Sequence, residues 1–130
     1  IPSTLDAAAL CKMADRGQIT GGLLDGPLAF DNAISSHAAQ IKHIESAVAG
    51  QADILAVPDL ESGNMLAKQL EYLAGASSAG IVLGARVPIA LTSRADPPRS
   101  RVASALLALL VAHNAHRNHT RKAWGTAGKV

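Results

Sequence analysis

Aromatic residues are almost absent from this sequence of 130 residues, which contains one Trp, one Tyr and one Phe. Proteins that bind single-stranded nucleic acid stack the bases on aromatic side chains. The net charge of +2 is also too small to indicate bulk binding to a polyanion. The composition therefore argues against a nucleic-acid-binding surface.

Cysteine and long apolar runs are also scarce. The single cysteine, Cys11, excludes an internal disulfide framework and is compatible with a reducing compartment. The longest apolar run, 102–112, falls far short of the ~20 residues needed to span a bilayer. No basic segment followed by an apolar one marks a signal peptide. These absences predict a soluble, cytoplasmic protein with no membrane partner, and the missing initiator Met favours a processed chain or a fragment.

About half of the residues are apolar, mostly Ala, Leu, Ile and Val, and their spacing predicts alternating helices and strands. We expect helices over 5–15, 32–48, from Ser62 or Asn64 to about 75, and 99–114, with strands over 19–24, 54–57, 81–83 and 87–91. Such an alternation favours an α/β fold with a mainly parallel sheet layered by helices. The last residues, 117–130, lose periodicity and gain charge, which predicts an exposed tail.

Two polar turns stand out, PDLESGN at 58–64 and TSRAD at 92–96, because each follows a predicted strand and precedes a predicted helix. Ligands of open α/β sheets bind in the crevice just beyond such strand ends. Free N–H groups and the helix dipole favour an anion there, and Arg94 can contact phosphate in a bidentate way. The alternative is a capping Ser93 and a solvated Arg94.

The segments DGPLAFD at 25–31, PDLESGN at 58–64 and TSRAD at 92–96, with AGIVLGAR at 79–86, resemble the phosphate acetyltransferase and phosphate butyryltransferase family. The resemblance covers about residues 4–112. Members of that family transfer an acyl group between coenzyme A and inorganic phosphate without a further cofactor. The resemblance also implies that the protein forms dimers. This likeness implies a three-layer α/β/α architecture similar to isocitrate and isopropylmalate dehydrogenases, with the site between two domains.

By that resemblance the chain is the C-terminal portion of a longer enzyme. Residues 1–86 would form part of one α/β domain, and 87–116 would supply the last strand and helix, returning to the other domain. The N-terminal half of the family would be absent, and the isolated chain could be inactive. The resemblance implies acyl-CoA and inorganic phosphate as substrates and a homo-oligomer as the assembly.

The resemblance also assigns candidate catalytic residues. Ser93 and Arg94 match the serine-arginine pair of the family, in which Ser93 would donate a hydrogen bond to the developing oxyanion. Acetyltransferase-type members carry an aspartate at the position of Ser100, whereas this sequence has Asp96, as butyryltransferase-like members do. Asp96 would take a proton from the coenzyme A thiol or orient Arg94, and its alternative role is a helix cap. The departure tilts the prediction toward the butyryltransferase-like branch.

Candidate substrate-binding residues come from the other matched motifs, and each has a structural alternative. They are Asp59, Gly63, Asn64 and Asp31. Gly63 would let the backbone approach a ligand closely. Asn64 would contact substrate or cap a helix, and Asp31 would contact substrate or cap the helix at 32–48.

Other charged and metal-ligating residues receive no site role. Arg86, Arg94, Arg99 and Arg101 form a cluster that suits the phosphates of coenzyme A or a solvated face, and only Arg94 is assigned to the site. The histidines lack metal-site spacing with a carboxylate or cysteine, so no metal is predicted, and His113, His116 and His119 fit a solvated helix end.

Two hypotheses of different classes remain. The first is a phosphate acyltransferase acting as part of a longer enzyme. The second is a catalytically inactive coenzyme A-binding or assembly module on the same scaffold, a reading that the absent aspartate at position 100 favours. A fusion to another acyl-CoA enzyme is a further option. Phosphate-dependent release of thiol from an acyl-CoA distinguishes the enzyme from the module.

Overall fold

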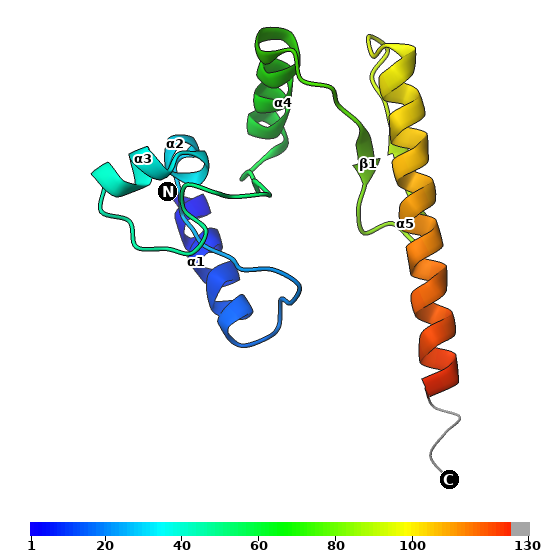
Figure 1. Ribbon diagram of the computed structural model, residues 1–130, viewed down its shortest axis with the longest axis horizontal. Coiled ribbons are helices and arrows are strands. Elements are labelled where there is room, and N and C mark those ends of the chain that lie inside the picture. Colours follow the sequence, from blue (N-terminus) through cyan, green and yellow to red (C-terminus); the bar gives the residue numbers. More distant parts are fainter. Residues whose placement is uncertain (126–130) are drawn as a thin grey trace. The chain divides into compact units, whose positions relative to one another are not determined.

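The computed structural model describes the backbone of residues 1–125 and the side chains of residues 1–115 (Figure 1). Two compact units, Ile1–Asn64 and Met65–Val130, divide the chain, and each is considered by itself. The elements in chain order are α1 (Pro2–Asp15), α2 (Phe30–Ile34), α3 (Ser36–Ile41), α4 (Leu60–Ala74), β1 (Gly80–Val82), β2 (Ile89–Leu91) and α5 (Pro98–Gly125). The predicted division of the chain between two domains at residue 87 stays a prediction.

The first unit begins with α1, close to the helix expected over 5–15. The loop after it returns to the helix, where the Cys11 thiol donates to the carbonyl of Gly26 over 3.7 Å. The strand expected over 19–24 is wrong, because these residues form turns and irregular backbone. An apolar run becomes a strand only when a neighbour accepts its N–H groups, and the described residues supply none here.

The single helix expected over 32–48 is also wrong, because Ser35 separates α2 from α3 and residues 42–48 are not helical. Ser35 adopts an extended conformation, with φ −120° and ψ 111°, and its hydroxyl accepts from the N–H of Ala38. A serine hydroxyl offers the backbone this alternative to helical continuation, so Ser35 ends α2 and caps α3. The helical spacing of the apolar residues was real, but a local hydrogen bond outweighed it.

The small core of the first unit lies where α2 and α3 meet the segment around Gly50. Asn32, Ala33 and Ala39 are buried there. Gly50 has φ +87°, its N–H donates to the carbonyl of Asn32 over 2.6 Å, and a Cβ on it would lie 2.5 Å from the Cα of Ser36. Only glycine allows this combination of positive φ and close approach.

Helix α4 starts at Leu60, earlier than the sequence predicts, because Asp59 rather than Ser62 or Asn64 caps it. The strand expected over 54–57 is wrong for the same reason as the one at 19–24, since no described strand pairs with it.

In the second unit, β1 and β2 form an antiparallel pair with the register Gly80–Leu91, Ile81–Ala90 and Val82–Ile89. They agree with the strands expected over 81–83 and 87–91. Helix α5 lies alongside both strands (Figure 1). The side chain of Ser104, only 1% exposed, fastens the helix to the hairpin, because its hydroxyl donates to the carbonyl of Ser100 over 2.8 Å and accepts from the N–H of Gly80 over 3.0 Å.

The predicted three-layer α/β/α fold with a mainly parallel sheet stays a prediction. The pairing that the described residues contain is antiparallel and joins two strands. Parallel strands are joined by a crossover of a dozen or more residues, whereas these two are joined by a short loop.

Helix α5 continues to Gly125, so the backbone is helical where the predicted tail over 117–130 begins. The side chains of that tail, and residues 126–130 altogether, lie outside the described residues. No helix among the described residues is long and apolar enough to cross a membrane.

Large apolar side chains are widely exposed in both units. Ile54 is 86% exposed, Leu60 82% and Leu73 84%. Exposed apolar surface on this scale is typical of a surface that packs against other protein.

Candidate functional site

The turn at Ser93–Asp96 directly follows β2 and directly precedes α5. The N–H of Asp96 donates to the carbonyl of Ser93 over 3.2 Å, which closes a β-turn. The carboxylate of Asp96 accepts in return from the N–H of Ser93 over 2.6 Å. This reciprocal pair fixes both ends of the turn, so Asp96 bonds backward to the turn rather than forward to the helix as a cap.

The hydroxyl of Ser93 is oriented by its own turn. The N–H of Ala95 donates to Ser93 Oγ over 3.3 Å. A hydroxyl has one donor and two acceptor positions, so this bond leaves the O–H of Ser93 available to a ligand.

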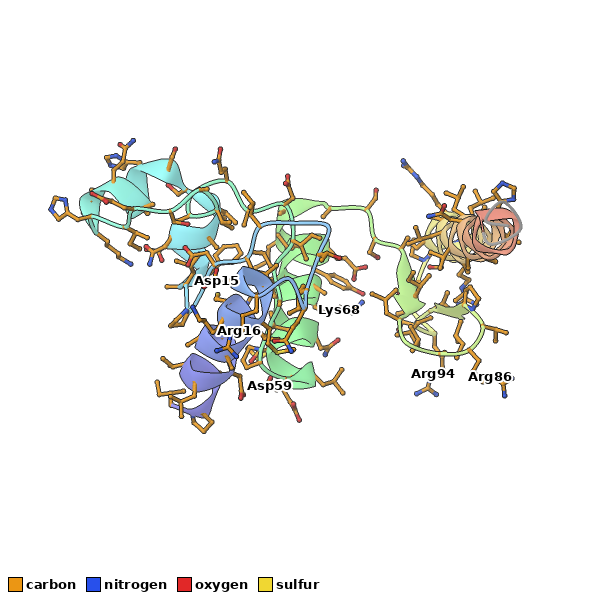
Figure 2. All side chains as sticks on the ribbon, turned by 90° about the horizontal axis from the view of Figure 1, so that it is seen from below. Asp15, Arg16, Asp59, Lys68, Arg86 and Arg94 are labelled. Atoms are coloured by element: carbon orange, nitrogen blue, oxygen red, sulfur yellow. The ribbon has the colours of Figure 1, made fainter. Side chains whose placement is uncertain are left out.

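Arg94 supplies further donors at the tip of the turn. No described residue accepts a hydrogen bond from its backbone N–H or forms an ion pair with its guanidinium. Figure 2 shows the Arg94 side chain extending to the side of the hairpin away from α5. Ser93 and Arg94 are exposed, so a ligand can reach the hydroxyl, the N–H and the guanidinium together.

Arg101, on the first turns of α5, holds the other side of the same turn. Its Nε donates to the carbonyl of Asp96 over 3.1 Å, and its Nη2 lies 3.0 Å from the carbonyl oxygen of Arg94 and 3.5 Å from that of Ser93. The planar fork of a guanidinium suits this work, because its donors point in several fixed directions.

Lys68 of α4 extends the charged cluster within the second unit. Its Nζ lies 2.6 Å from Glu71 Oε2 and 4.0 Å from Asp96 Oδ1. The hydrogen bond to Glu71 raises the pKa of Lys68, and the same bond together with one from Ser78 lowers the pKa of Glu71. Lys68 therefore remains a cation beside the turn at neutral pH.

The second predicted turn, at the start of α4, is organised locally. Asp59 Oδ1 accepts from the N–H of Ser62 over 2.7 Å, which makes Asp59 the N-cap of α4 and lowers its pKa. Gly63 sits on the first turns of the helix, where an added Cβ would lie 2.9 Å from Val57 Cγ2. The close neighbour of Gly63 in this chain is thus Val57. Asn64 is exposed on the helix and does not cap it.

Asp31 lies inside α2, so it cannot cap a helix over 32–48. Its carboxylate accepts from Lys42 Nζ over 2.8 Å and from the N–H of Asn32 over 2.9 Å. The hydrogen bond from Lys42 is the main reason that the pKa of Asp31 is lowered.

The predicted site residues therefore fall into three groups. Ser93, Arg94 and Asp96 are joined in one hydrogen-bonded turn of the second unit. Asp59, Gly63 and Asn64 lie together at the start of α4, and Asp31 stands apart with Lys42 in the first unit. Their substrate-binding roles stay predictions.

Sequence inspection missed two residues of this site. It gave Lys68 no role and placed Arg101 in a cluster typical of a solvated face. Arg101 acts eight positions after Ser93 through backbone carbonyls, which leave no trace in residue type. Lys68 is brought to Asp96 by tertiary structure, so its sequence position carries no signal either.

The described side chains form neither a metal-binding cluster nor an activated thiol. Within residues 1–115, no three His, Cys, Asp or Glu side chains are grouped to hold a metal ion. The side chains of His116 and His119 lie outside the described residues. Burial raises the pKa of the Cys11 thiol, so it is a poor nucleophile at neutral pH.

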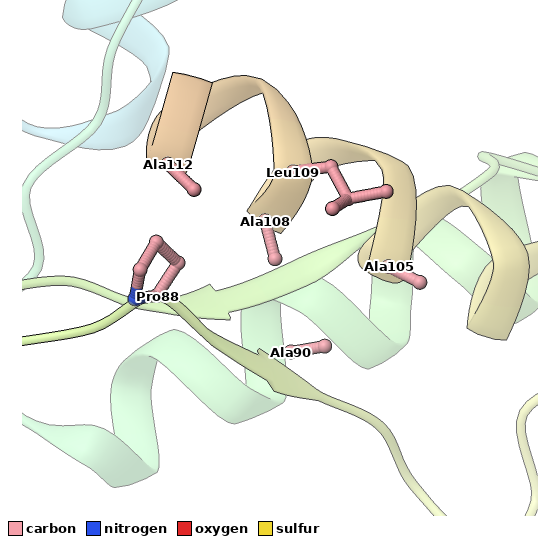
Figure 3. Close-up of a pocket in the computed structure, with 6 residues that line it drawn as sticks. All are labelled: Pro88, Ala90, Ala105, Ala108, Leu109 and Ala112. Carbon is pink, nitrogen blue, oxygen red and sulfur yellow. The ribbon is translucent and has the colours of Figure 1, made fainter. Parts of the chain in front are cut away.

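A separate cavity of about 410 Å³ lies between β2 and α5 (Figure 3). Six residues line it, Pro88, Ala90, Ala105, Ala108, Leu109 and Ala112. None of them carries a polar side chain, so the cavity offers no side-chain donor to a phosphate.

The chain is similar to phosphate acetyltransferases and phosphate butyryltransferases along most of its length. The family model described as "Phosphate acetyl/butaryl transferase" matches residues 1–109. The chain is 70% identical over 112 residues to a phosphate acetyltransferase of Rhizobium meliloti, which covers 86% of this chain and 35% of that protein. It is 72% identical over 111 residues to one of Rickettsia prowazekii, covering 85% and 32%.

A phosphate butyryltransferase of Clostridium acetobutylicum is 50% identical over 114 residues, covering 88% of this chain and 38% of that protein. The chain thus spans about a third of the length of the curated relatives it matches. Which portion of those proteins it corresponds to stays a prediction.

Proposed function

We propose that this chain, which belongs to the phosphate acetyl/butyryl transferase family, supplies part of the active site of an enzyme that transfers a short acyl group between coenzyme A and inorganic phosphate. The observation that carries this proposal is the Ser93–Asp96 turn. It presents a hydroxyl, a backbone N–H and a guanidinium to solvent, while the carboxylate of Asp96 accepts a hydrogen bond from the N–H of Ser93 within the same turn.

These donors match the charges that the reaction develops. An oxygen of phosphate attacks the thioester carbonyl and forms a C–O bond, and the carbonyl oxygen becomes an oxyanion. The C–S bond then breaks, which yields an acyl phosphate and a coenzyme A thiolate that takes up a proton. Arg94 would bind the phosphate in a bidentate way, and the Ser93 hydroxyl would donate to the oxyanion.

The contacts of Asp96 are those of a residue that orients the turn. One carboxylate oxygen accepts from the N–H of Ser93 over 2.6 Å, and the other lies 4.0 Å from Lys68 Nζ. We therefore assign Asp96 to orientation, the second of the two roles that the sequence left open, and leave the thiolate to be protonated by another group.

We propose acetyl as the acyl group. Support comes from two relatives named phosphate acetyltransferase that are 70% and 72% identical to the chain, whereas a phosphate butyryltransferase is 50% identical. This proposal departs from the sequence-based prediction, in which Asp96 favoured the butyryltransferase-like branch. Ser100, at the position of the family's aspartate, is 8% exposed.

The remainder of the enzyme would come from a longer polypeptide, in the cytoplasm and as a homo-oligomer. Support for further protein contacts comes from α5, on which Val102 is 59% exposed and Leu110 66%. Helices this apolar are normally covered.

The test is thiol release from acetyl-CoA and butyryl-CoA, with and without phosphate, by the full-length transferase, meaning the longer protein that carries this segment. We expect phosphate-dependent release, faster with acetyl-CoA. If the protein binds coenzyme A without phosphate-dependent release, the inactive binding or assembly module is the correct function instead. Equal rates with both substrates would contradict only the acetyl preference.

A further inference from the structure

We propose that Arg101 is a positioning residue of the phosphate acyltransferase site, which orients the backbone N–H of Arg94 toward the substrate anion. This inference rests on the proposed function. Arg101 belongs to none of the motifs that indicated the family, and it reaches the turn only through the three carbonyl oxygens of Ser93, Arg94 and Asp96.

The geometry of the peptide bond connects these carbonyls to the site. In a planar trans peptide, the C=O of one residue and the N–H of the next point in opposite directions. The carbonyl of Ser93 accepts from the N–H of Asp96 over 3.2 Å and lies 3.5 Å from the guanidinium of Arg101, and these two contacts together hold the N–H of Arg94 on the opposite side. Binding the carbonyl of Arg94 does the same for the N–H of Ala95.

The two N–H groups that are oriented in this way have different uses. The N–H of Ala95 donates to Ser93 Oγ and fixes the serine hydroxyl. The N–H of Arg94 has no acceptor among the described residues, and it is adjacent to the Ser93 hydroxyl along the chain. A pre-oriented donor of this kind stabilises a developing anion without reorganisation during the reaction.

Arginine suits this arrangement because its planar guanidinium offers donors to three carbonyl oxygens at once. Nε donates to the carbonyl of Asp96, and Nη2 donates to the carbonyls of Arg94 and Ser93. A lysine ammonium is a compact point charge on a flexible stem, so it would bind one or two of these oxygens without fixing the turn.

The first experiment compares Arg101→Ala with Arg99→Ala in the full-length transferase. Arg99 is a matched control, because it is an exposed arginine on the same helical turn and makes no ion pair with a described residue. For Arg101→Ala we expect kcat/KM for phosphate to fall roughly 10- to 100-fold, since a displacement of about 1 Å costs on that order. KM for acyl-CoA and the melting temperature should match those of Arg99→Ala.

Two further readouts distinguish positioning from a general structural role. Guanidinium ion added at millimolar concentration should restore part of the activity of Arg101→Ala and leave the wild type unchanged. Arg101→Lys should retain an intermediate activity, and it replaces Arg101→Ala in the comparison if the alanine variant does not fold. A loss that follows the melting temperature, with no rescue by guanidinium, would overturn the proposal.

Hydrogen exchange tests whether Arg101 holds the Ser93–Asp96 turn, without relying on turnover. In Arg101→Ala, amides of residues 93–96 should exchange faster, whereas those of α5 beyond residue 104 should not. Unchanged exchange at 93–96 would overturn the inference even in an active enzyme. Absence of phosphate-dependent release in the wild type would instead refute the proposed function, so the two failures are distinguishable.

Discussion

The two polar turns of this chain look alike in sequence, yet their hydrogen bonds run in opposite directions. Asp59 accepts from a residue three positions ahead, and the bond begins α4. Asp96 accepts from a residue three positions behind, and the bond closes a turn outside α5. The first turn uses its polar groups to start a helix, whereas the second is held from behind by Arg101 and keeps its donors free. A carboxylate in a polar turn before a helix therefore indicates a binding turn only when its own bonds leave other donors unused.

The largest expected effect comes from the donor at the tip of the second turn. We expect Arg94→Ala to lower kcat/KM of the full-length transferase roughly 1,000-fold, at the upper end for loss of one transition-state donor. Arg94→Lys should recover little, because an ammonium cannot make the bidentate contact. Steady-state thiol release at varied phosphate measures both. Arg86→Ala, an exposed arginine of the β1–β2 loop, is the control and should retain activity. If Arg94→Ala matches it, the second turn is no binding turn.

Ser93→Ala should lower kcat by roughly 100-fold, the lower end for one oxyanion donor. It also removes the acceptor of the Ala95 N–H, so the turn loses part of its internal support. Ser93→Thr keeps the hydroxyl and should restore most of the rate. Single-turnover kinetics separate this loss from changes in substrate binding. A fully active Ser93→Ala would remove the serine from the proposed mechanism.

The hydrogen bond by which Ser104 fastens α5 to β1 should contribute to the free energy of unfolding. Ser104→Ala leaves the partly buried N–H of Gly80 without its partner, so we expect a loss of about 1 kcal/mol, the low end for an unsatisfied donor. The urea midpoint of the full-length protein measures the change. Ser100→Ala is the control, since only the backbone carbonyl of Ser100 takes part in the bond. Equal midpoints for the two variants would show that the bond from Gly80 to Ser104 does not stabilise the protein.

The smallest effect concerns the first turn and pH. The N–H of Ser62 stabilises the charged form of Asp59, so its pKa is below the ordinary value of 3.8. A lowered pKa in the folded state means that the cap's contribution is complete above the unfolded pKa and is lost as pH falls through the folded pKa. We expect acid to accelerate hydrogen exchange at the first turn of α4 in that range. In Asp59→Asn, which caps without titrating, this acid dependence should disappear. Its persistence would assign it to another group.

The sequence predicted the elements that local signals determine. Helix α1, the two strands of the hairpin and the start of α5 near Pro98 lie close to the expected residues. The failures at 19–24 and 54–57 share one cause, since strands depend on partners that apolar spacing does not reveal. The break at Ser35 depended on a single side-chain bond.

The site shows the same division between local and tertiary information. The grouping of Ser93, Arg94 and Asp96 followed from their adjacency and from the family resemblance. Which way the carboxylate of Asp96 bonds, and which arginine of the cluster contacts the turn, depended on how the chain folds back at α5. Residue types alone cannot distinguish an arginine that meets solvent from one that meets three carbonyls.

Helix α5 carries both the guanidinium that holds the substrate turn and, less than one turn later, the hydroxyl that fastens the first strand of the hairpin. The turn, β1 and the start of α5 should therefore move as one body. A rotation of this helix about its own axis would shift both attachments together, so the fit of whatever packs on its exposed leucines would set how accurately the turn meets its substrate.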